Sequence, residues 1–141
     1  MKRLFYLLAA AAFTACGSAT TLSVMTFNMR YDNPEDGADN WRFRRGRVAE
    51  VIASHGVDVF GTQELLANQL GDLKRLLPGY AAVGVGREDG AEAGEFSAVF
   101  YRRDRFTPLE SGTFWLSETP DVAGSKGWDG ACERVATWVV L

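Results

Sequence analysis

The sequence predicts an α/β domain that opens with a parallel strand–helix–strand unit and continues in short strands. Two apolar segments rich in β-branched residues, 22–28 and 57–64, flank a helical segment at 41–54. A second amphipathic helix follows at 65–77, where leucines recur at 4, 3, 4 spacing. Strand-like segments then dominate the rest of the chain. Because one helix joins the first two strands, we expect those strands to be parallel.

The composition is that of a globular protein with one hydrophobic core. The chain has 141 residues, of which 47% are hydrophobic and 23% charged, enough for a single domain. Its formal net charge is −3, which excludes an overall basic field that would attract nucleic acid. The cysteines are Cys16 and Cys132, and His55 is the only histidine. These residues cannot supply a conventional zinc site.

Residues 1–15 predict a signal peptide. A positively charged start, Lys2-Arg3, precedes an apolar run at 4–13, which is too short to span a bilayer as a helix. We therefore expect an exported protein, located in the periplasm or at the bacterial outer membrane and cell surface.

Cys16 directly follows small residues in a segment, Phe-Thr-Ala-Cys, that resembles a bacterial lipobox. We expect a lipid on Cys16, which would attach the protein to the membrane and leave Cys132 without a disulfide partner. The alternative is an ordinary secretion signal that is cleaved near Ala15 or Ala19. Both interpretations predict export.

The first strand, 22–28, is apolar on both faces, which predicts burial on both sides. A loop rich in turn-forming residues follows at 31–40. Asn40 is expected to cap the helix at 41–54, and Gly56 to end it in a left-handed conformation. The expected buried stripe of this helix consists of Val48, Val51 and Ile52, and its arginines, Arg44, Arg45 and Arg47, are expected to face solvent.

After the strand at 57–64, Pro78-Gly79 is expected to end the helix at 65–77. The stretch 102–105 predicts a hairpin turn. The remaining expected strands are 80–85, 95–102, 106–109, 113–116 and 134–141. Because the chain stops inside an apolar strand, we expect it to be a fragment of a longer protein.

Polar side chains end both strands of the parallel unit. Asn28 closes the first strand and Glu64 closes the second. The carboxyl ends of parallel strands meet at one edge of a sheet, where ligands bind in α/β proteins. An amide and a carboxylate there fit Mg²⁺ that is shared with a substrate phosphate. The alternative is that Glu64 only favours the dipole of the next helix and Asn28 only turns the chain.

The segments TFNMR (26–30) and VFGTQE (59–64) resemble the opening of the endonuclease/exonuclease/phosphatase family, which has the deoxyribonuclease-I-like fold. GVGREDG, GEFSAVFYRRDRF and SGTFWLSETPD resemble a secreted bacterial branch of that family. The resemblance covers 22–141. It implies the first half of a four-layer α/β/β/α sandwich, truncated, with the C-terminal half of the domain absent.

The resemblance also implies roles for single residues. Glu64 would be the main Mg²⁺ ligand, with Mn²⁺ as a possible substitute. Asn28 would lie beside it as a second metal-binding and catalytic residue that orients the metal shell and the scissile phosphate. Glu95 would orient a catalytic histidine that this chain lacks, Arg134 would contact substrate phosphate, and Tyr101 would line the cleft. The alternatives are a surface charge or ion pair for Glu95 and Arg134, and a half-buried strand tyrosine for Tyr101.

The family's later N-x-H, G-D-x-N and S-D-H segments do not occur in this sequence. His55 ends a helix, where a helix cap is the natural role. The resemblance therefore implies a parent Mg²⁺-dependent phosphoesterase, in which water attacks a phosphate ester in line, and a chain that alone lacks hydrolysis. We also expect poor folding, because the second sheet and half of the core would be absent.

The substrate stays open at this point among DNA, RNA, lipid headgroups, inositol phosphates and sugar phosphates. No obligate protein partner is evident in the sequence. One competing interpretation is a surface lipoprotein module of the same fold that binds a ligand without catalysis. Another is a complete small α/β protein that shares only its structure with the family.

Overall fold

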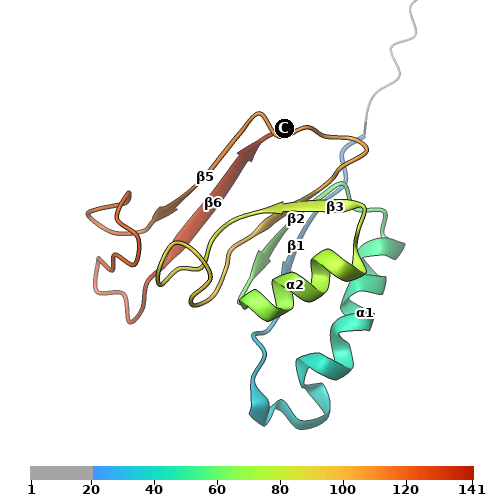
Figure 1. Cartoon of the computed structure of the whole chain (residues 1–141), viewed down its shortest axis with the longest axis horizontal. Helices are drawn as coiled ribbons and strands as arrows, with labels where there is room; N and C mark the ends of the chain where they lie inside the picture. The colour runs from blue at the N-terminus through green and yellow to red at the C-terminus, as the bar shows by residue number, and fades with distance from the viewer. Residues whose placement is uncertain (1–20) are drawn as a thin grey trace, which may run out of the picture.

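Residues 21–141 are described by a computed structural model, in which two β-sheets stack and helices cover the outer face of the first sheet (Figure 1). The expected signal peptide at 1–15 and the expected lipid on Cys16 lie outside the described residues. No helix within 21–141 is long and apolar enough to cross a membrane. The mixed α/β class expected from the sequence is confirmed.

The first sheet has four strands in the order β1-β2-β4-β3. Strands β1 and β2 are parallel, with Asn28 aligned to Gln63, which confirms the predicted strand–helix–strand unit. Strand β4 runs antiparallel to both of its neighbours. The bounds are Val24–Asn28 for β1, Val59–Gln63 for β2, Tyr80–Val83 for β3 and Val99–Arg102 for β4.

Three helical segments link these strands. They are the 3-10 segment η1 (Pro34–Asp39), α1 (Trp41–Ser54) and α2 (Ala67–Leu76). The Asn40 side chain accepts a hydrogen bond from the backbone N–H of Arg42 at 3.2 Å, and Gly56 has φ of 57°, so both predicted ends of α1 are confirmed. Helix α2 begins later than expected because Leu65 still pairs with Phe96 through its backbone.

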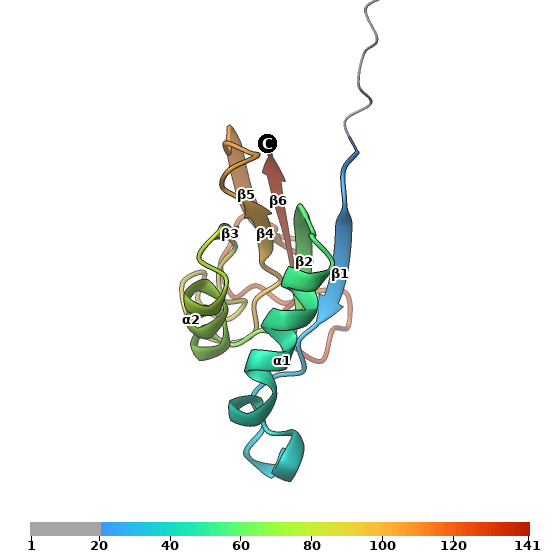
Figure 2. The same ribbon diagram turned by 90° about the vertical axis from the view of Figure 1, so that its right-hand side faces the viewer.

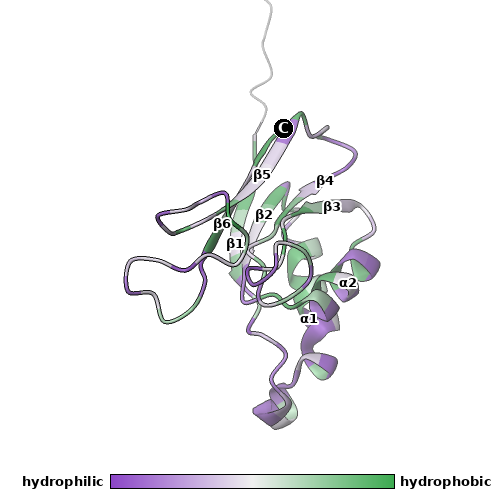
Figure 3. Ribbon diagram, turned by 60° about the vertical axis from the view of Figure 1, so that its left-hand side comes forward, coloured by the Kyte–Doolittle hydropathy of each residue, from purple (hydrophilic) through white to green (hydrophobic). Residues whose placement is uncertain are grey.

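The core lies between the helices and the first sheet. Phe60 of β2 stacks on Phe100 of β4 with ring centroids 4.6 Å apart, and Ile52 of α1 and Leu73 of α2 are fully buried. Val51 is only half-buried, unlike the prediction. In Figure 3 hydrophobic colour follows strands such as β2 and β6, whereas η1 and the adjoining end of α1 are largely hydrophilic.

The prediction that the first strand is buried on both sides is wrong. Strand β1 is the edge of the first sheet, and only Met25 and Phe27 pack against the core. On the other face Val24 is 66% exposed. The second sheet contacts β3 and β4, so within the described residues it leaves β1 uncovered.

The second sheet consists of β5 (Glu110–Trp115) and β6 (Val135–Val140), which are antiparallel. The expectation that this sheet is absent is therefore wrong. So is the expected division into strands 106–109 and 113–116, because 106–109 is irregular and a single strand covers 110–115. The turn at 102–105 is not a hairpin: β4 already has a neighbour on each side, so the chain leaves the first sheet there. Regular pairing of β4 starts at Val99 rather than at Glu95.

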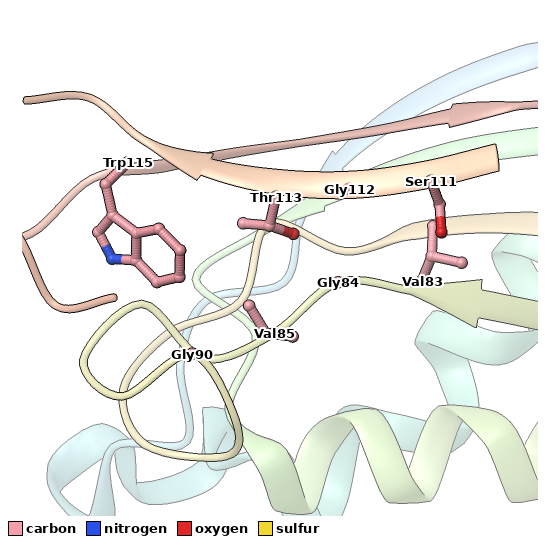
Figure 4. A pocket seen from close by; sticks show the side chains of 8 residues that line it. All are labelled: Val83, Gly84, Val85, Gly90, Ser111, Gly112, Thr113 and Trp115. Atoms are coloured by element: carbon pink, nitrogen blue, oxygen red, sulfur yellow. The ribbon is translucent and has the colours of Figure 1, made fainter. Parts of the chain in front are cut away.

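The inner face of β5 packs towards the loop that follows β3 (Figure 4). Trp115 donates from Nε1 to the backbone oxygen of Arg87 at 2.6 Å, and Thr113 lies 3.0 Å from Thr137 between their hydroxyl oxygens. Between β5 and this loop lies a hollow of about 370 Å³. The Trp115 bond holds the second sheet against the loop after β3, whereas the Thr113–Thr137 contact joins β5 to β6 within the second sheet.

Candidate functional site

Asn28 and Glu64 meet at the carboxyl edge of the parallel pair. The Asn28 side chain donates from Nδ2 to Glu64 Oε1 at 2.9 Å. The backbone N–H of Met29 donates to the oxygen of Gln63 at 2.9 Å, so the two strands stay aligned up to the site. Figure 2 shows both strand arrows pointing towards the same end of the molecule. The juxtaposition expected from the sequence is present.

Asn28 holds the carboxylate through its amide nitrogen. Its amide oxygen accepts a hydrogen bond from the backbone N–H of Arg30 at 2.8 Å, so the oxygen faces the loop after β1. Glu64 receives the Asn28 amide on Oε1 and the N–H of Tyr31 on Oε2 at 3.4 Å. A carboxylate has about four lone-pair positions. Glu64 therefore keeps acceptor capacity for a further ligand.

Two residues at this site have left-handed backbones although they are not glycine. Arg30 has φ of 50° and Glu64 has φ of 57°. This region costs an L-residue roughly 1–2 kcal/mol, and such residues persist where the surroundings hold them, often at functional sites. Helix α2 has Leu66 as its N-cap and no acidic residue in its first turn. The alternative in which Glu64 serves the dipole of that helix is therefore not supported.

The side chains at this site fit a cation that has few protein ligands rather than one that is fully enclosed by protein side chains. Among residues 21–141 no group of three or more His, Cys, Asp and Glu side chains could hold a metal ion. Glu64 is half-buried and has no ion-pair partner in that range. Mg²⁺ commonly keeps several waters and binds through one or two carboxylates together with substrate phosphate. Glu64 fits that mode, with Asn28 fixing its orientation.

Gln69, which the sequence reasoning missed, ties the start of α2 to the loop after β1. It is fully buried. Its Oε1 accepts hydrogen bonds from the backbone N–H groups of Leu66 at 3.0 Å and Asp32 at 3.2 Å. Its Nε2 donates to the carbonyl oxygen of Arg30 at 3.0 Å. The Leu66 bond closes a local capping arrangement, but nothing in the local sequence signals the two longer-range bonds.

The prediction that Arg44 faces solvent is wrong. Its guanidinium is half-buried and donates to three backbone oxygens: from Nε to Asp39 at 2.9 Å, from Nη1 to Met29 at 2.5 Å, and from Nη2 to Arg30. Burial lowers the pKa of Arg44 below its usual value. Arg44 lies three residues after the buried Trp41, a helical spacing that places both on one face. That spacing is the signal that could have revealed it.

Three other arginines near this end of the chain, Arg30, Arg45 and Arg47, form ion pairs. Arg45 pairs with Asp72 and Arg47 with Glu50, both at 2.9 Å. Both arginines are exposed, which agrees with the expected solvated face, although Asp72 itself is mostly buried. Arg30 pairs with Asp36 at 2.9 Å, and its hydrogen bond lowers the pKa of that carboxyl.

Glu95, Tyr101 and Arg134 form no hydrogen bond with the Asn28–Glu64 pair in the described structure. Glu95 pairs with Arg87 at 2.8 Å, and Tyr101 is 5% exposed, which favours a structural role for that tyrosine. Arg134 is exposed and precedes β6. Strand β6 begins at the end of the molecule where β1 and β2 finish (Figures 1 and 2).

His55 caps α1, as expected. Its Nδ1 lies 2.7 Å from the carbonyl oxygen of Val51, and its backbone N–H donates to the same oxygen. This contact engages one nitrogen of the sole histidine in local helix capping, away from the Asn28–Glu64 pair.

Comparison with known proteins gives a consistent result. The family model described as "Endonuclease/Exonuclease/phosphatase family" matches residues 25–141. A solved endonuclease/exonuclease/phosphatase from Bacteroides vulgatus is similar at 52% identity and a TM-score of 0.80, over 81% of this chain and 44% of that chain. No curated protein matches.

Two further solved structures are similar. A mannosyl-6-phosphatase from Bacteroides thetaiotaomicron is 49% identical with a TM-score of 0.82, over 84% of this chain and 45% of that chain. A functionally unknown protein from Enterococcus faecalis is 33% identical with a TM-score of 0.76, over 82% and 45%. The chain thus spans less than half the length of these solved relatives.

Proposed function

The chain belongs to the endonuclease/exonuclease/phosphatase family, and we propose that it carries the metal-binding wall of an exported, Mg²⁺-dependent phosphoester hydrolase. The observation that carries the proposal is the contact between Asn28 and Glu64 at the carboxyl edge of the parallel strands, with Glu64 in a left-handed conformation. A structural role alone gives no reason to keep a costly backbone and an acceptor-rich carboxylate at that edge.

In this proposal Glu64 binds the cation and Asn28 orients the carboxylate. The cation would neutralise charge on the phosphate oxygens as water attacks. Arg134 would bind phosphate oxygens through its guanidinium fork. Glu95, held by Arg87, would orient an imidazole that this sequence does not contain. We therefore expect that the 141-residue chain binds metal and does not hydrolyse phosphate esters by itself.

The proposed substrate is a sugar phosphomonoester. The support is the similarity to the Bacteroides thetaiotaomicron mannosyl-6-phosphatase at 49% identity. The signal-like segment at 1–15 and the lipobox-like Cys16 support export and a lipid anchor, which would place this chemistry outside the cytoplasm. A protein that extends this chain with the family's later motifs should prefer mannose 6-phosphate to a phosphodiester such as bis(p-nitrophenyl) phosphate.

A second candidate is a module of the same fold that binds ligands without catalysis. The Asn28–Glu64 contact is compatible with it, since binding a cation together with a phosphate needs no histidine. Sequencing the gene beyond the Leu141 codon separates the two candidates. A continuing reading frame with N-x-H, G-D-x-N and S-D-H supports the hydrolase, and an authentic stop codon supports the binding module.

The metal site is tested by Mn²⁺ binding, which electron paramagnetic resonance detects directly. We expect Glu64→Gln to weaken Mn²⁺ binding at least tenfold, since it removes the carboxylate charge but keeps the side-chain shape. Glu50→Gln, on the exposed side of α1, is the matched control and should leave binding unchanged. Equal affinities in the wild type and Glu64→Gln would refute the assignment.

A further inference from the structure

We propose that Arg44 and Gln69 are positioning residues, which hold the carbonyl of Arg30 from two sides and so keep Asn28 and Glu64 in the geometry that binds metal. The inference rests on the proposed metal-binding function of that pair. It assigns a role to two side chains that touch neither Asn28 nor Glu64 by any hydrogen bond in the described structure.

Arg44 approaches the loop after β1 from α1. Its guanidinium donates to the carbonyls of Met29, Arg30 and Asp39. The guanidinium carbon, Cζ, lies 5.0 Å from the centre of the Trp41 ring. Within residues 21–141 it forms no ion pair with a carboxylate. Nearby carboxylates favour the charge of Arg44, but its N–H groups are hydrogen-bonded only while these backbone oxygens stay in place. Arg44 therefore stabilises one particular path of the loop.

Gln69 approaches the same loop from α2. Its Nε2 donates to the Arg30 carbonyl, while its Oε1 accepts from the N–H groups of Asp32 and Leu66. Because Gln69 is fully buried, loss of any of these bonds would leave a polar atom without water. Gln69 thus links the loop to the first residues after Glu64.

The Arg30 carbonyl therefore receives two donors, one from each helix. The same residue has the left-handed backbone, with φ of 50°, and its N–H donates to Asn28 Oδ1 at 2.8 Å. The next N–H, that of Tyr31, reaches Glu64 Oε2 at 3.4 Å. If Arg30 relaxed to a right-handed conformation, the peptide planes on its two sides would rotate relative to each other, so these two N–H groups could no longer reach Asn28 and Glu64 together. The two helix side chains are thus placed to preserve the hydrogen bonds that orient both members of the pair.

The test compares Arg44→Lys and Gln69→Met with the matched control Arg45→Lys in the full 141-residue chain. A lysine keeps the charge of Arg44 but cannot reach three carbonyls at once. Methionine keeps the length of Gln69 without its polar atoms. We expect Arg44→Lys and Gln69→Met each to raise the Mn²⁺ dissociation constant about 10- to 100-fold, as loss of supporting contacts around a metal ligand typically does. Arg45→Lys should leave it within about twofold.

A second readout separates positioning from mere stability. Amide hydrogen exchange of Arg30 and Tyr31 is measured at a temperature where circular dichroism shows each variant folded. We expect exchange at these two amides to accelerate at least tenfold in Arg44→Lys. A variant with a lower melting temperature but unchanged Mn²⁺ affinity and unchanged exchange at both amides would overturn the inference.

The two proposals fail in distinguishable ways. If the wild type does not bind Mn²⁺, the proposed function of the site fails, and amide exchange alone decides whether Arg44 and Gln69 hold the loop. If the wild type binds Mn²⁺ through Glu64, and Arg44→Lys and Gln69→Met bind it equally well, the positioning role is refuted and the metal site is not. Should Gln69→Met not fold, Arg44→Lys alone carries the test, because it leaves every hydrogen bond of the Gln69 side chain in place.

Discussion

Glu64 carries the proposed metal-binding carboxylate and has a backbone conformation that is unfavourable for most residues other than glycine. Its φ of 57° lies in the left-handed region, where a Cβ atom crowds the following carbonyl. Most solvent-facing positions with this conformation are better filled by glycine. A glutamate there indicates that the side chain is needed for something other than stability.

We therefore predict that Glu64→Gly is more stable than Glu64→Ala by about 1 kcal/mol. Both variants lose the bond from Asn28, so the comparison isolates the backbone strain, which only glycine relieves. Urea unfolding followed by circular dichroism measures the difference. Equal stability of the two variants, or a more stable alanine variant, would show that position 64 is not strained.

Single residues also show where sequence reasoning succeeds and where it stops. The meeting of Asn28 and Glu64 was predictable, because each ends a strand and parallel strands end at one edge. The bonds of Gln69 to Arg30 and Asp32 span more than 30 positions. Such contacts depend on how a helix packs against a loop, and the local pattern of side chains does not encode that.

At the scale of elements, Asp58 links the start of β2 to the residue before β1 and to the turn after β4. The carboxylate is buried. It accepts a hydrogen bond from the Ser23 N–H, just before β1, at 2.9 Å, and it pairs at 2.5 Å with Arg105, in the turn after β4. The Ser23 bond lowers the pKa of Asp58, burial opposes this effect, and Arg105 and Arg102 lower the pKa further. Asp58 is therefore more acidic in the folded than in the unfolded chain.

This difference in pKa predicts an acid-sensitive contribution to stability. A lowered folded-state pKa stabilises the protein fully above the unfolded pKa of about 3.9, and the contribution is lost as the pH falls through the folded value. Between about pH 5 and pH 3, the free energy of unfolding should fall more steeply in the wild type than in Asp58→Asn. Urea unfolding at several pH values measures the free energy of unfolding of both proteins. If the free energy of unfolding falls equally steeply with pH in the wild type and in Asp58→Asn, this role for Asp58 is ruled out. Asp121→Asn, which changes an exposed carboxylate, serves as the control.

Element boundaries were predicted best where local chemistry decides them. Asn40 and Gly56 set the two ends of α1 as expected, because capping acts within a few residues. The stretch 106–109 looked like a strand, yet it is irregular. Pro108 there lacks an N–H for a ladder, and the chain is crossing from the first sheet to the second. Strand pairing is a long-range property, so periodicity alone could not reveal this crossing.

At the scale of the whole molecule, the second sheet leaves an apolar surface on its outer side. The register places Phe114, Trp138 and Val140 on the face opposite to Thr113 and Trp115. Each of these three side chains is about 40% exposed. The Trp138 indole lies over Gly112. A side chain at position 112 would not fit beneath it, because its Cβ would be 2.9 Å from Trp138 Nε1. Contiguous exposed apolar surface of this kind promotes association.

We predict that the 141-residue chain self-associates through this face as its concentration rises. Burying apolar area stabilises an assembly by roughly 25 cal/mol per Å². Within residues 21–141, β5 and β6 pair only with each other, so the other edge of each strand offers further backbone pairing. The double variant Phe114→Lys with Val140→Lys should stay monomeric in sedimentation equilibrium over a concentration range in which the wild type shows a rising average mass. Val122→Lys, which removes an even more exposed apolar side chain outside the sheet, should behave as the wild type does. A monomeric wild type, or a double variant that associates equally, would show that the outer face of this sheet does not drive association.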